Sequence, residues 1–395
     1  MTTRRVLIVT IPPYEGGVPT KARILARHLQ RLGHDVTVAH YAVLSREPEL
    51  CAPCWSWRTP ALRAGTVFDG VPSVAVGCRF PELEFPYYHC SALWRKTIAA
   101  YDRHIAVGGN ILVSNLLHES GVKHMTWAGT PFFEDRQDRQ ATMPVLRKLV
   151  DRVVLSPLLA RLEHRLLTAG APILCVSRYT RRRLQELGGR ADRLHHVPVP
   201  VDLDLFFPPT TPASAGVIGF AGRINDPRKN IGLLLDALAL ARRSGTALTL
   251  KLTGEPDVTL REKVKEKGLD EVVTFTGFLT PAQLPEFYRS LDVFALPSHQ
   301  EGFGIVGVEA LASGLPIVST RCGGPEDYVQ DGVNGYLVDH DAKAMAESLT
   351  QIVADRPHRS ALSHEARRMA EERYGLGPFA QTVGDVWESV WGDRP

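Results

Sequence analysis

One stretch late in the chain constrains the possible folds more than any other. An apolar run at residues 293–296 is followed by a loop with two glycines and then by a second apolar run at residues 306–313. This order predicts a buried strand, a tight loop and a helix. The amides of Gly304, Ile305 and Val306 would then begin the helix without intrahelical partners, where the helix dipole favours an anion such as a phosphate.

Two glutamates bracket this loop, Glu301 before the predicted helix and Glu309 inside it. Because 3.6 residues make one helical turn, both carboxylates can face one ligand. A carboxylate only accepts hydrogen bonds, so it suits the hydroxyl groups of a ribose or a hexose better than a phosphate. The alternative is structural: Glu301 complements the helix dipole, and Glu309 is solvated.

The residues around these glutamates form a longer and more specific pattern. The chain has Ser298-x-x-Glu301-Gly-Phe-Gly-x-x-x-x-Glu309, followed by Gly323-Gly324-Pro325-Glu326 and Asp331-Gly332-x-x-Gly335. This pattern resembles the donor-site signature of retaining GT-B glycosyltransferases of family 4, the glycosyl transferases group 1 type. The resemblance implies an α/β fold, GT-B, with two facing Rossmann-like doubly wound domains and a C-terminal crossover helix.

The resemblance also implies roles for individual positions. We expect Glu309 to hold the ribose of a nucleotide sugar and Glu301 to hold hydroxyl groups of the transferred sugar, assisted by the backbone of Phe303 and Gly304. In the resembled family the backbone at the position of Phe278 contacts the base. The anomeric configuration of the sugar would be retained.

A second strand-loop-helix pattern precedes this stretch, with a strand at residues 217–221 and a helix at residues 231–242. Arg223 and Lys229 flank the N-terminus of that helix, so two cations converge where a diphosphate would lie. The resembled family uses similar residues for the donor phosphates. Ordinary surface cations are the alternative.

The N-terminal region predicts a doubly wound domain of its own. A strand at residues 5–10 is followed by a loop with Gly16 and Gly17, a helix at residues 20–32 and a strand at residues 35–39. Ligands of such domains lie beyond the carboxyl ends of the strands. The resemblance places Gly16 and Gly17 beside the transferred sugar and the diphosphate.

Residues 46–101 show no regular pattern and contain many aromatic side chains. Rigid aromatic faces suit sugar rings or flat apolar acceptors, and loops on an α/β scaffold often carry recognition. A satellite hydrophobic cluster under long loops is an equal alternative.

The chain departs from the resembled family at one position near the reacting sugar. After a predicted strand at residues 123–127, where relatives usually carry a histidine, the chain has Gly129 and its neighbours. His124 in the strand and His118 on the preceding helix are the nearest candidates for that role. A lone histidine at either position is more often structural than catalytic.

The segment 178–183 contains four arginines, so this face could meet anionic lipid. Solvated helix surface is the alternative.

A proline-rich linker follows, in which Val199-Pro200 stands where relatives commonly have Asn-Gly. With this linker as the boundary, the resemblance implies an acceptor-binding domain at residues 1–200, a nucleotide-sugar-binding domain at residues 201–375, and a C-terminal helix at residues 376–395 that packs back on the first.

Length and composition fit this division. The chain has 395 residues, enough for two domains, and 23% charged residues, as in soluble globular proteins. The net charge of +3 does not indicate a nucleic-acid partner. No apolar run approaches the length of a membrane span, and the scattered cysteines fit reduced thiols, so we expect a cytoplasmic protein. The Cys51-Ala-Pro-Cys54 pair has no second pair to complete a zinc site, so we predict no metal.

Together these features predict a retaining, metal-independent glycosyltransferase that needs no cofactor beyond its donor. The donor would be a nucleoside-diphosphate sugar with UDP or GDP, and the acceptor group a hydroxyl. Two alternatives stay open at this point. One is a non-catalytic sugar-nucleotide-binding subunit, and the other is a membrane-surface enzyme with a lipid acceptor.

Overall fold

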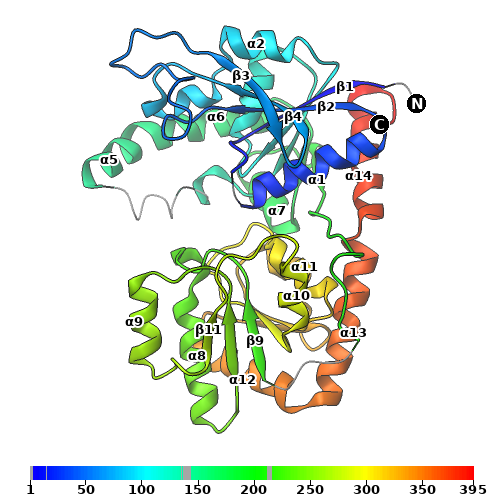
Figure 1. Ribbon diagram of the computed structural model, residues 1–395. Helices are drawn as coiled ribbons and strands as arrows, with labels where there is room; N and C mark the ends of the chain where they lie inside the picture. The colour runs from blue at the N-terminus through cyan, green and yellow to red at the C-terminus, as the bar shows by residue number, and fades with distance from the viewer. Residues whose placement is uncertain (1–2, 15, 135, 137–143, 211–215) are drawn as a thin grey trace. The chain divides into compact units, whose positions relative to one another are not determined.

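The computed structural model describes residues 3–14, 16–134, 136, 144–210 and 216–395 (Figure 1). The chain forms two compact units, which we call unit 1 and unit 2. Unit 1 comprises Met1–Pro198 and Ala380–Pro395, and unit 2 comprises Val199–Phe379. Helix α14, Leu376–Trp391, therefore begins in unit 2 and ends in unit 1.

The described part of unit 1 contains an eight-stranded sheet in the order β3-β4-β2-β1-β5-β6-β7-β8. Strand β3 pairs antiparallel with β4, and the other pairs run parallel. Five of the six residues of the central strand β1 are buried, because parallel strands carry helices on both faces. The strands are β1 Arg5–Thr10, β2 Asp35–Tyr41, β3 Leu62–Val67, β4 Val71–Val76, β5 Arg103–Gly108, β6 Met125–Ala128, β7 Ile173–Cys175 and β8 Leu194–His196.

Helices cover this sheet, and two large groups of buried side chains lie between them and the strands. Helices α2 and α3 pack with β1 and β5 in one group, and α6 and α7 pack with β6 and β7 in the other. The described helices of unit 1 are α1 Gly17–Arg31, α2 Ala92–Ile98, α3 Asn115–Ser120, α5 Val145–Val150, α6 Ser156–Thr168 and α7 Arg178–Glu186, with a π-helical turn η4 Asp151–Leu155 and short 3₁₀ turns η1 Pro81–Leu83, η2 Phe85–Tyr88, η3 Leu112–Ser114 and η5 Ala191–Arg193.

The end of the chain is fixed to unit 1 by specific contacts. The Trp387 ring stacks on His34 with 5.5 Å between the ring centroids. The Asp393 carboxylate accepts hydrogen bonds from Arg4 at 2.9 Å and from Arg103 at 2.7 Å. Residues 380–395 therefore complete the fold of unit 1 rather than that of unit 2.

The expectation of an irregular region at residues 46–101 was wrong in part. The hairpin β3–β4 and helix α2 lie within it. Strand β3 escaped prediction because it is an edge strand with five exposed residues, so its sequence lacks the apolar alternation of a half-buried strand. The aromatic residues there divide: Trp94 and Tyr88 are buried in the core, whereas Trp55 and Trp57 are exposed.

Two predicted boundaries also need correction. Helix α1 begins at Gly17, three residues earlier than expected, because Gly16 caps it with a φ of 106° that favours glycine. The apolar run at residues 105–113 also predicts one strand, but strand β5 ends at Gly108. A Cβ atom on Gly108 would lie 2.3 Å from the Asn110 carbonyl oxygen, so the chain turns sharply there.

Unit 2 contains, within its described residues, a parallel six-stranded sheet in the order β11-β10-β9-β12-β13-β14. The α/β architecture predicted from the sequence is confirmed in both units. Its strands are β9 Val217–Phe220, β10 Thr249–Leu252, β11 Val273–Phe275, β12 Val293–Leu296, β13 Ile317–Thr320 and β14 Gly335–Val338. Its helices are α8 Ile231–Arg243, α9 Val258–Glu266, α10 Leu284–Arg289, α11 Ile305–Ala312, α12 Ala342–Ala354 and α13 Arg356–Arg373, with 3₁₀ turns η6 Pro227–Lys229 and η7 Gly324–Asp327.

The strand order of unit 2 fixes where a ligand can bind. From β9 the chain proceeds to β10 and β11 on one side, and it then returns to β12, β13 and β14 on the other. Neighbouring loops after β9 and β12 therefore diverge, which leaves a crevice at the carboxyl ends of these two strands.

Among the residues with described positions, no helix combines the length and the apolarity that a membrane span requires.

Lys21 of α1 is a buried cation in unit 1. Its side-chain ammonium donates hydrogen bonds to the carbonyl oxygens of Gly108 at 2.8 Å and Trp127 at 3.3 Å. Complete burial lowers the pKa of Lys21 from 10.5 to about 7, because the charged form loses its hydration.

This lowered pKa predicts a pH-dependent stability. Between about pH 7 and 10.5 the unfolded chain binds a proton that the folded chain has released, so the free energy of unfolding rises with pH. The slope from this group is at most about 1.4 kcal/mol per pH unit. We expect Lys21→Met to remove it, so that the melting temperature of the variant minus that of the wild type falls from pH 7 to pH 9.5. Lys96→Met, at an exposed position of α2, is the control. An unchanged difference at both pH values would contradict the assignment.

Candidate donor site

Helix α11 begins where the sequence places an anion site. It starts at Ile305, one residue earlier than predicted, and Gly304 caps it with a φ of 77° that favours glycine. The amides of Gly304, Ile305 and Val306 lie at this end, where no intrahelical acceptor exists for them. The sequence prediction of a strand, a glycine turn and a helix is confirmed here.

Tyr328 holds the start of α11 in place. Its hydroxyl donates a hydrogen bond to the Gly304 carbonyl oxygen at 3.0 Å. A Cβ atom on Gly304 or Gly307 would lie 2.7 or 2.3 Å from that hydroxyl oxygen, so both positions exclude a side chain. Burial, together with the charge of Glu301, raises the pKa of Tyr328 well above its usual value, so the hydroxyl stays protonated. Sequence reasoning missed this residue, although it follows the Gly323-Gly324-Pro325-Glu326 motif closely.

The loop after β13 pairs with the loop after β12. The Glu301 amide donates to the Cys322 carbonyl oxygen, and the Gly324 amide donates to the Glu301 carbonyl oxygen, both at 2.8 Å. A Cβ atom on Gly324 would lie 2.4 Å from the Phe303 Cα atom, so only glycine allows this approach. These contacts fix the backbone on both sides of the Glu301 side chain.

Glu301 and Lys229 form an ion pair between the two loops at the crevice. The Lys229 Nζ lies 2.5 Å from Glu301 Oε1, and the Ser298 hydroxyl donates to the same oxygen at 2.8 Å. Glu301 is buried, and 17% of the Lys229 side chain is exposed. The His299 amide also donates to the Arg228 carbonyl oxygen at 2.8 Å, which joins the same two loops. The structure thus brings together two of the residues predicted from widely separated motifs.

Arg223 and Arg228 gather around Asp226 in the loop after β9. Arg223 lies 2.8 Å and Arg228 3.0 Å from the same carboxylate oxygen of Asp226. Burial alone would raise the pKa of Asp226, but hydrogen bonding to Arg228 and the charges of both arginines lower it below its usual value. Sequence analysis singled out Arg223, which is largely exposed, and missed Asp226 and Arg228. The Asp226-Pro227 pair, a typical start of a turn, could have indicated Asp226.

Glu309 lies on α11 one turn beyond the amides. The Tyr288 hydroxyl donates a hydrogen bond to it at 2.8 Å. Burial and the charge of Glu309 raise the pKa of Tyr288 well above its usual value, so this hydroxyl remains a donor. Tyr288 is fully buried and was not predicted as part of the site. Glu309 itself is half-buried, so its carboxylate is oriented by the core and is still accessible.

Phe278 follows β11 at the same edge of the sheet. Its side chain is 81% exposed, and the preceding Gly277 accepts a hydrogen bond from the Gly254 amide at 2.7 Å. The loops after β10 and β11 are therefore joined to each other. This arrangement leaves the backbone at Phe278 at the carboxyl edge of the sheet, on the β11 side of β9.

Gly16 and Gly17 lie in unit 1 and are described within it. Gly16 caps α1, Gly17 is the first helical residue, and both are exposed. A Cβ atom on Gly16 would meet no other atom within 4 Å.

The two histidine candidates lie in different surroundings. His124 is buried, its Nδ1 lies 3.0 Å from the Val122 carbonyl oxygen, and burial lowers its pKa. His118 lies on α3 and is half-buried. The position after β6 is instead approached by Lys21, whose Nζ bonds to the Trp127 carbonyl oxygen and lies 3.6 Å from where a Cβ atom of Gly129 would be.

Cys51 is buried and Cys54 is exposed, and both are free thiols. Within the described ranges, no group of three or more potential ligands is arranged around a common point.

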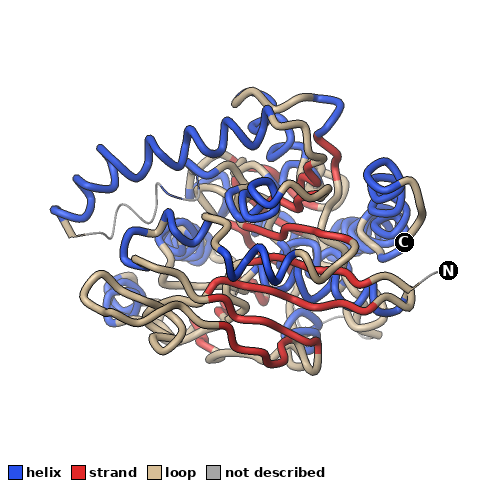
Figure 2. Tube along the Cα trace, turned by 90° about the horizontal axis from the view of Figure 1, so that it is seen from above, coloured by secondary structure: helices blue, strands red, loops and turns tan. Residues whose placement is uncertain are grey.

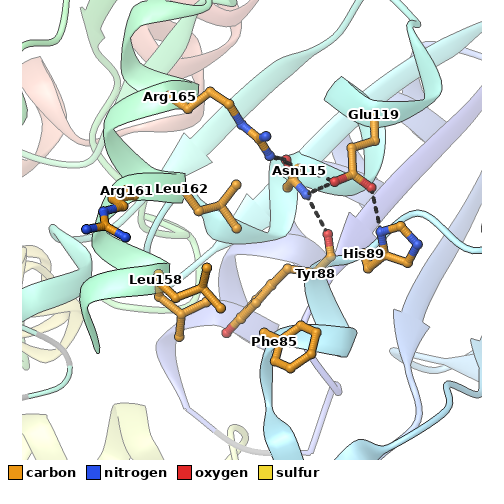
Figure 3. Close-up of a pocket in the computed structure, with 10 residues that line it drawn as sticks. Phe85, Tyr88, His89, Asn115, Glu119, Leu158, Arg161, Leu162 and Arg165 are labelled. Atoms are coloured by element: carbon orange, nitrogen blue, oxygen red, sulfur yellow. Dashed lines mark hydrogen bonds and ion pairs between the residues drawn. The ribbon is translucent and has the colours of Figure 1, made fainter. Parts of the chain in front are cut away.

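Unit 1 also contains a pocket of about 320 Å³ formed by η2, α3 and α6 (Figure 3). Asn115 donates to the Tyr88 carbonyl oxygen and to Glu119, both at 2.8 Å, and Arg165 donates to Asn115 at 3.1 Å. His89 lies 3.0 Å from Glu119. One wall is therefore polar, and Figure 3 shows the apolar side chains of α6 opposite it.

Comparisons with known proteins find one family and several relatives that resemble this chain. Residues 204–369 match the family described as Glycosyl transferases group 1. The D-inositol 3-phosphate glycosyltransferase of Xylanimonas cellulosilytica is 32% identical over 253 residues, which are 59% of this chain and 60% of the relative. The GDP-mannose-dependent alpha-(1-6)-phosphatidylinositol monomannoside mannosyltransferase of Mycobacterium tuberculosis is 30% identical over 231 residues, which are 53% of this chain and 60% of the relative. The matches thus span three fifths of these two curated relatives.

Solved structures extend the likeness to both units. HepE of Anabaena in complex with UDP has a TM-score of 0.74 and 19% identity, with 98% of this chain and 100% of that chain covered. Sucrose-phosphate synthase of Thermosynechococcus elongatus has a TM-score of 0.73 and 18% identity, with 98% and 99% covered. At this identity the likeness concerns the fold, and the fold class is GT-B. The match to the glycosyl transferases group 1 family is confined to residues 204–369, which lie within unit 2.

Proposed function

We propose that the protein transfers a glycosyl group from a nucleoside-diphosphate sugar to an acceptor hydroxyl, with retention of the anomeric configuration. The observation that carries the proposal is the Lys229–Glu301 ion pair, which joins the loops after β9 and β12 beside the free end of α11. Cation, carboxylate and helix amides thus lie where a doubly wound domain binds nucleotides. Relatives named for GDP-mannose and a neighbour solved with UDP support a donor of the UDP or GDP type.

The chemical problem in such a transfer is charge. As the bond between the sugar and the diphosphate breaks, the diphosphate becomes more anionic and the sugar becomes cation-like. Lys229 and Arg223, together with the amides of residues 304–306, would stabilise the departing diphosphate. Glu301 keeps the Lys229 ammonium in position before the donor binds, because the ion pair fixes an otherwise flexible side chain.

The remaining residues of the site would bind the donor. Glu309, oriented by Tyr288, accepts hydrogen bonds from the ribose, and the backbone at Phe278 contacts the base. Glu301 binds hydroxyl groups of the transferred sugar, with the Phe303 and Gly304 backbone. Unit 2, predicted from the sequence as residues 201–375, would thus hold the donor. Residues 1–200 would hold the acceptor, with Gly16 and Gly17 facing the reacting groups.

The proposed reaction is metal-independent and retaining. The positive charge that stabilises the leaving diphosphate comes from side chains and helix amides, so the step requires no metal cation. The acceptor would attack on the face from which the diphosphate departs, and a phosphate oxygen would take its proton. This route also needs no histidine after β6, which agrees with the presence of Gly129 there.

The first test is Lys229→Ala, with release of nucleoside diphosphate measured over a panel of nucleotide sugars. We expect kcat/KM for the accepted donor to fall by about 10²- to 10³-fold, as when one stabilising donor is removed from an oxyanion site. Lys263→Ala, at an exposed position of α9, is the matched control and should be unchanged. A wild-type protein that binds a donor without releasing diphosphate would instead support the non-catalytic subunit.

The second test concerns the ribose contact. Glu309→Gln keeps the size of the side chain and an acceptor for Tyr288 but removes the charge. We expect KM for the donor to rise about tenfold with kcat changed less, because a charge-assisted hydrogen bond to the ground state is weakened. Glu262→Gln on the surface of α9 serves as the control. A fall in kcat at unchanged KM would contradict a role in donor binding.

The third test is chelation. Turnover should stay within about twofold after treatment with EDTA, because the cationic groups of the site belong to the protein. Loss of activity with EDTA, restored by a divalent cation, would refute metal independence. It would not affect the assignment of the donor site itself.

A further inference from the structure

One helical segment of unit 1 carries a strip of exposed apolar side chains. Helix α5, η4 and α6 follow one another without a break, and Figures 1 and 2 show this rod extending away from the sheet of unit 1. The first half of this rod exposes several large apolar side chains. Large exposed apolar patches on soluble proteins mark interaction sites. We call the following residues, with their exposed fractions, the apolar strip: Val145 87%, Leu149 59%, Val150 45%, Val153 64%, Val154 55% and Leu158 44%.

The strip has the geometry of an amphipathic helix. At about 100° per residue, Val145, Leu149 and Val150 of α5 fall within one half of the helix circumference. Val153 and Val154 follow in the π-helical turn η4, where the angle per residue is smaller, and they return to the same half. Arg147 and Arg152 lie just outside the two edges of that half, and Lys148 lies between them on the other side. Cations therefore flank the apolar surface along its length.

The opposite side of the segment is anchored to unit 1. Asp151 is buried and pairs with Arg136, which also donates two hydrogen bonds to Glu84 at 2.9 and 3.0 Å. The Ser156 hydroxyl donates to Asp151 at 3.0 Å, and Leu159 is buried one turn further on. Because the inner face is held by these contacts, the orientation of the strip follows from the fold.

We propose that the apolar strip is a docking surface for an anionic lipid membrane. Between residues 144 and 162 the chain has four cationic side chains and one acidic side chain, and the acidic one is the buried Asp151. A surface with exposed valines and leucines flanked by arginine and lysine can insert its apolar side below the headgroups while its cations meet their phosphates. The segment would lie in the interface, because no described helix is suited to span a bilayer.

The pocket formed by η2, α3 and α6 lies at the end of this surface. Leu158 belongs to the strip and also lines the pocket, together with Arg161 and Arg165 from the same helix (Figure 3). If the strip contacts a bilayer, the pocket, which has one apolar and one polar wall, would therefore lie next to the membrane surface. This mixed polarity matches the boundary between acyl chains and headgroups.

Helix α7 is the other basic candidate in unit 1, and its arginines are partly engaged within the protein. Arg183 pairs with Glu134 at 2.8 Å and with Glu186, and the Arg182 Nε lies 4.0 Å from Glu186. The segment 178–183 also lacks exposed valine or leucine side chains. We therefore place the contact on the apolar strip, and α7 becomes a comparison in the test.

The test is co-sedimentation of the full-length protein with vesicles of phosphatidylcholine alone or with about 30% phosphatidylglycerol. We expect binding to the anionic vesicles to be stronger by about tenfold and to weaken with added salt. The combined variant Leu149→Ser, Val153→Ser and Val154→Ser should lose about tenfold in binding. Val258→Ser, at an equally exposed position of α9, should bind like the wild type.

Two further combined variants, each of which removes positive charges, complete the design. Arg147→Gln with Lys148→Gln and Arg152→Gln should reduce the preference for anionic vesicles, and Arg181→Gln with Arg182→Gln should not. No binding to anionic vesicles, equal binding by the serine variant, or loss only in the α7 variant would overturn the proposal. So would a dimeric wild type that the serine variant converts to a monomer, since the strip would then bind a second copy. Binding is measured without donor, so the result is independent of glycosyl transfer.

Discussion

The hydrogen bonds between the loops after β12 and β13 are the constraint on which the candidate site depends. Backbone groups on both sides of the Glu301 side chain are paired, one to Cys322 and one to Gly324. The carboxylate therefore cannot move away from the crevice without breaking sheet-like contacts. Gly324 makes this possible, because any side chain there would collide with the backbone of Phe303.

Charge compensation follows from that placement. Glu301 is buried, and a buried carboxylate is costly unless it is paired and hydrogen-bonded. Lys229 and Ser298 satisfy the same oxygen of Glu301, so the cation proposed to meet the diphosphate is already in place. Asp226 plays the corresponding part for Arg223 and Arg228. The loop after β9 thus carries its cations in fixed positions, and this pre-organisation lowers the entropic cost of binding an anion.

Unit 1 contains a buried lysine at the corresponding edge of its sheet. Lys21 reaches the carboxyl ends of β5 and β6 and bonds to two carbonyl oxygens there, without a carboxylate among these partners. It approaches the position where the sequence resemblance led us to look for a histidine. A fixed amine therefore lies at this edge of the sheet beside Gly129.

The sequence by itself determined the α/β class, the strands β9 and β12 of unit 2, and the motif that contains Glu301 and Glu309. Continuous apolar runs and glycine turns act locally, so strand β12 and the start of α11 were predicted to within one residue. Glu301, Glu309 and Lys229 were predicted as site residues because they lie in or beside the loops at the predicted helix starts. Local pattern failed at β3, whose exposed edge position removes the apolar alternation, and at Gly108, where a close backbone approach ends the strand.

Only the tertiary structure decided which of these side chains meet. Lys229 and Glu301 are 72 positions apart, and nothing in either local pattern specifies their pairing. Tyr288 and Tyr328 orient Glu309 and the start of α11 from inside the core, and buried tyrosines look like ordinary packing residues in a sequence. The same holds for the apolar strip, because valines and leucines at helical spacing predict a buried face. Their exposure depends on what packs against the segment, and that information is distributed over the whole fold.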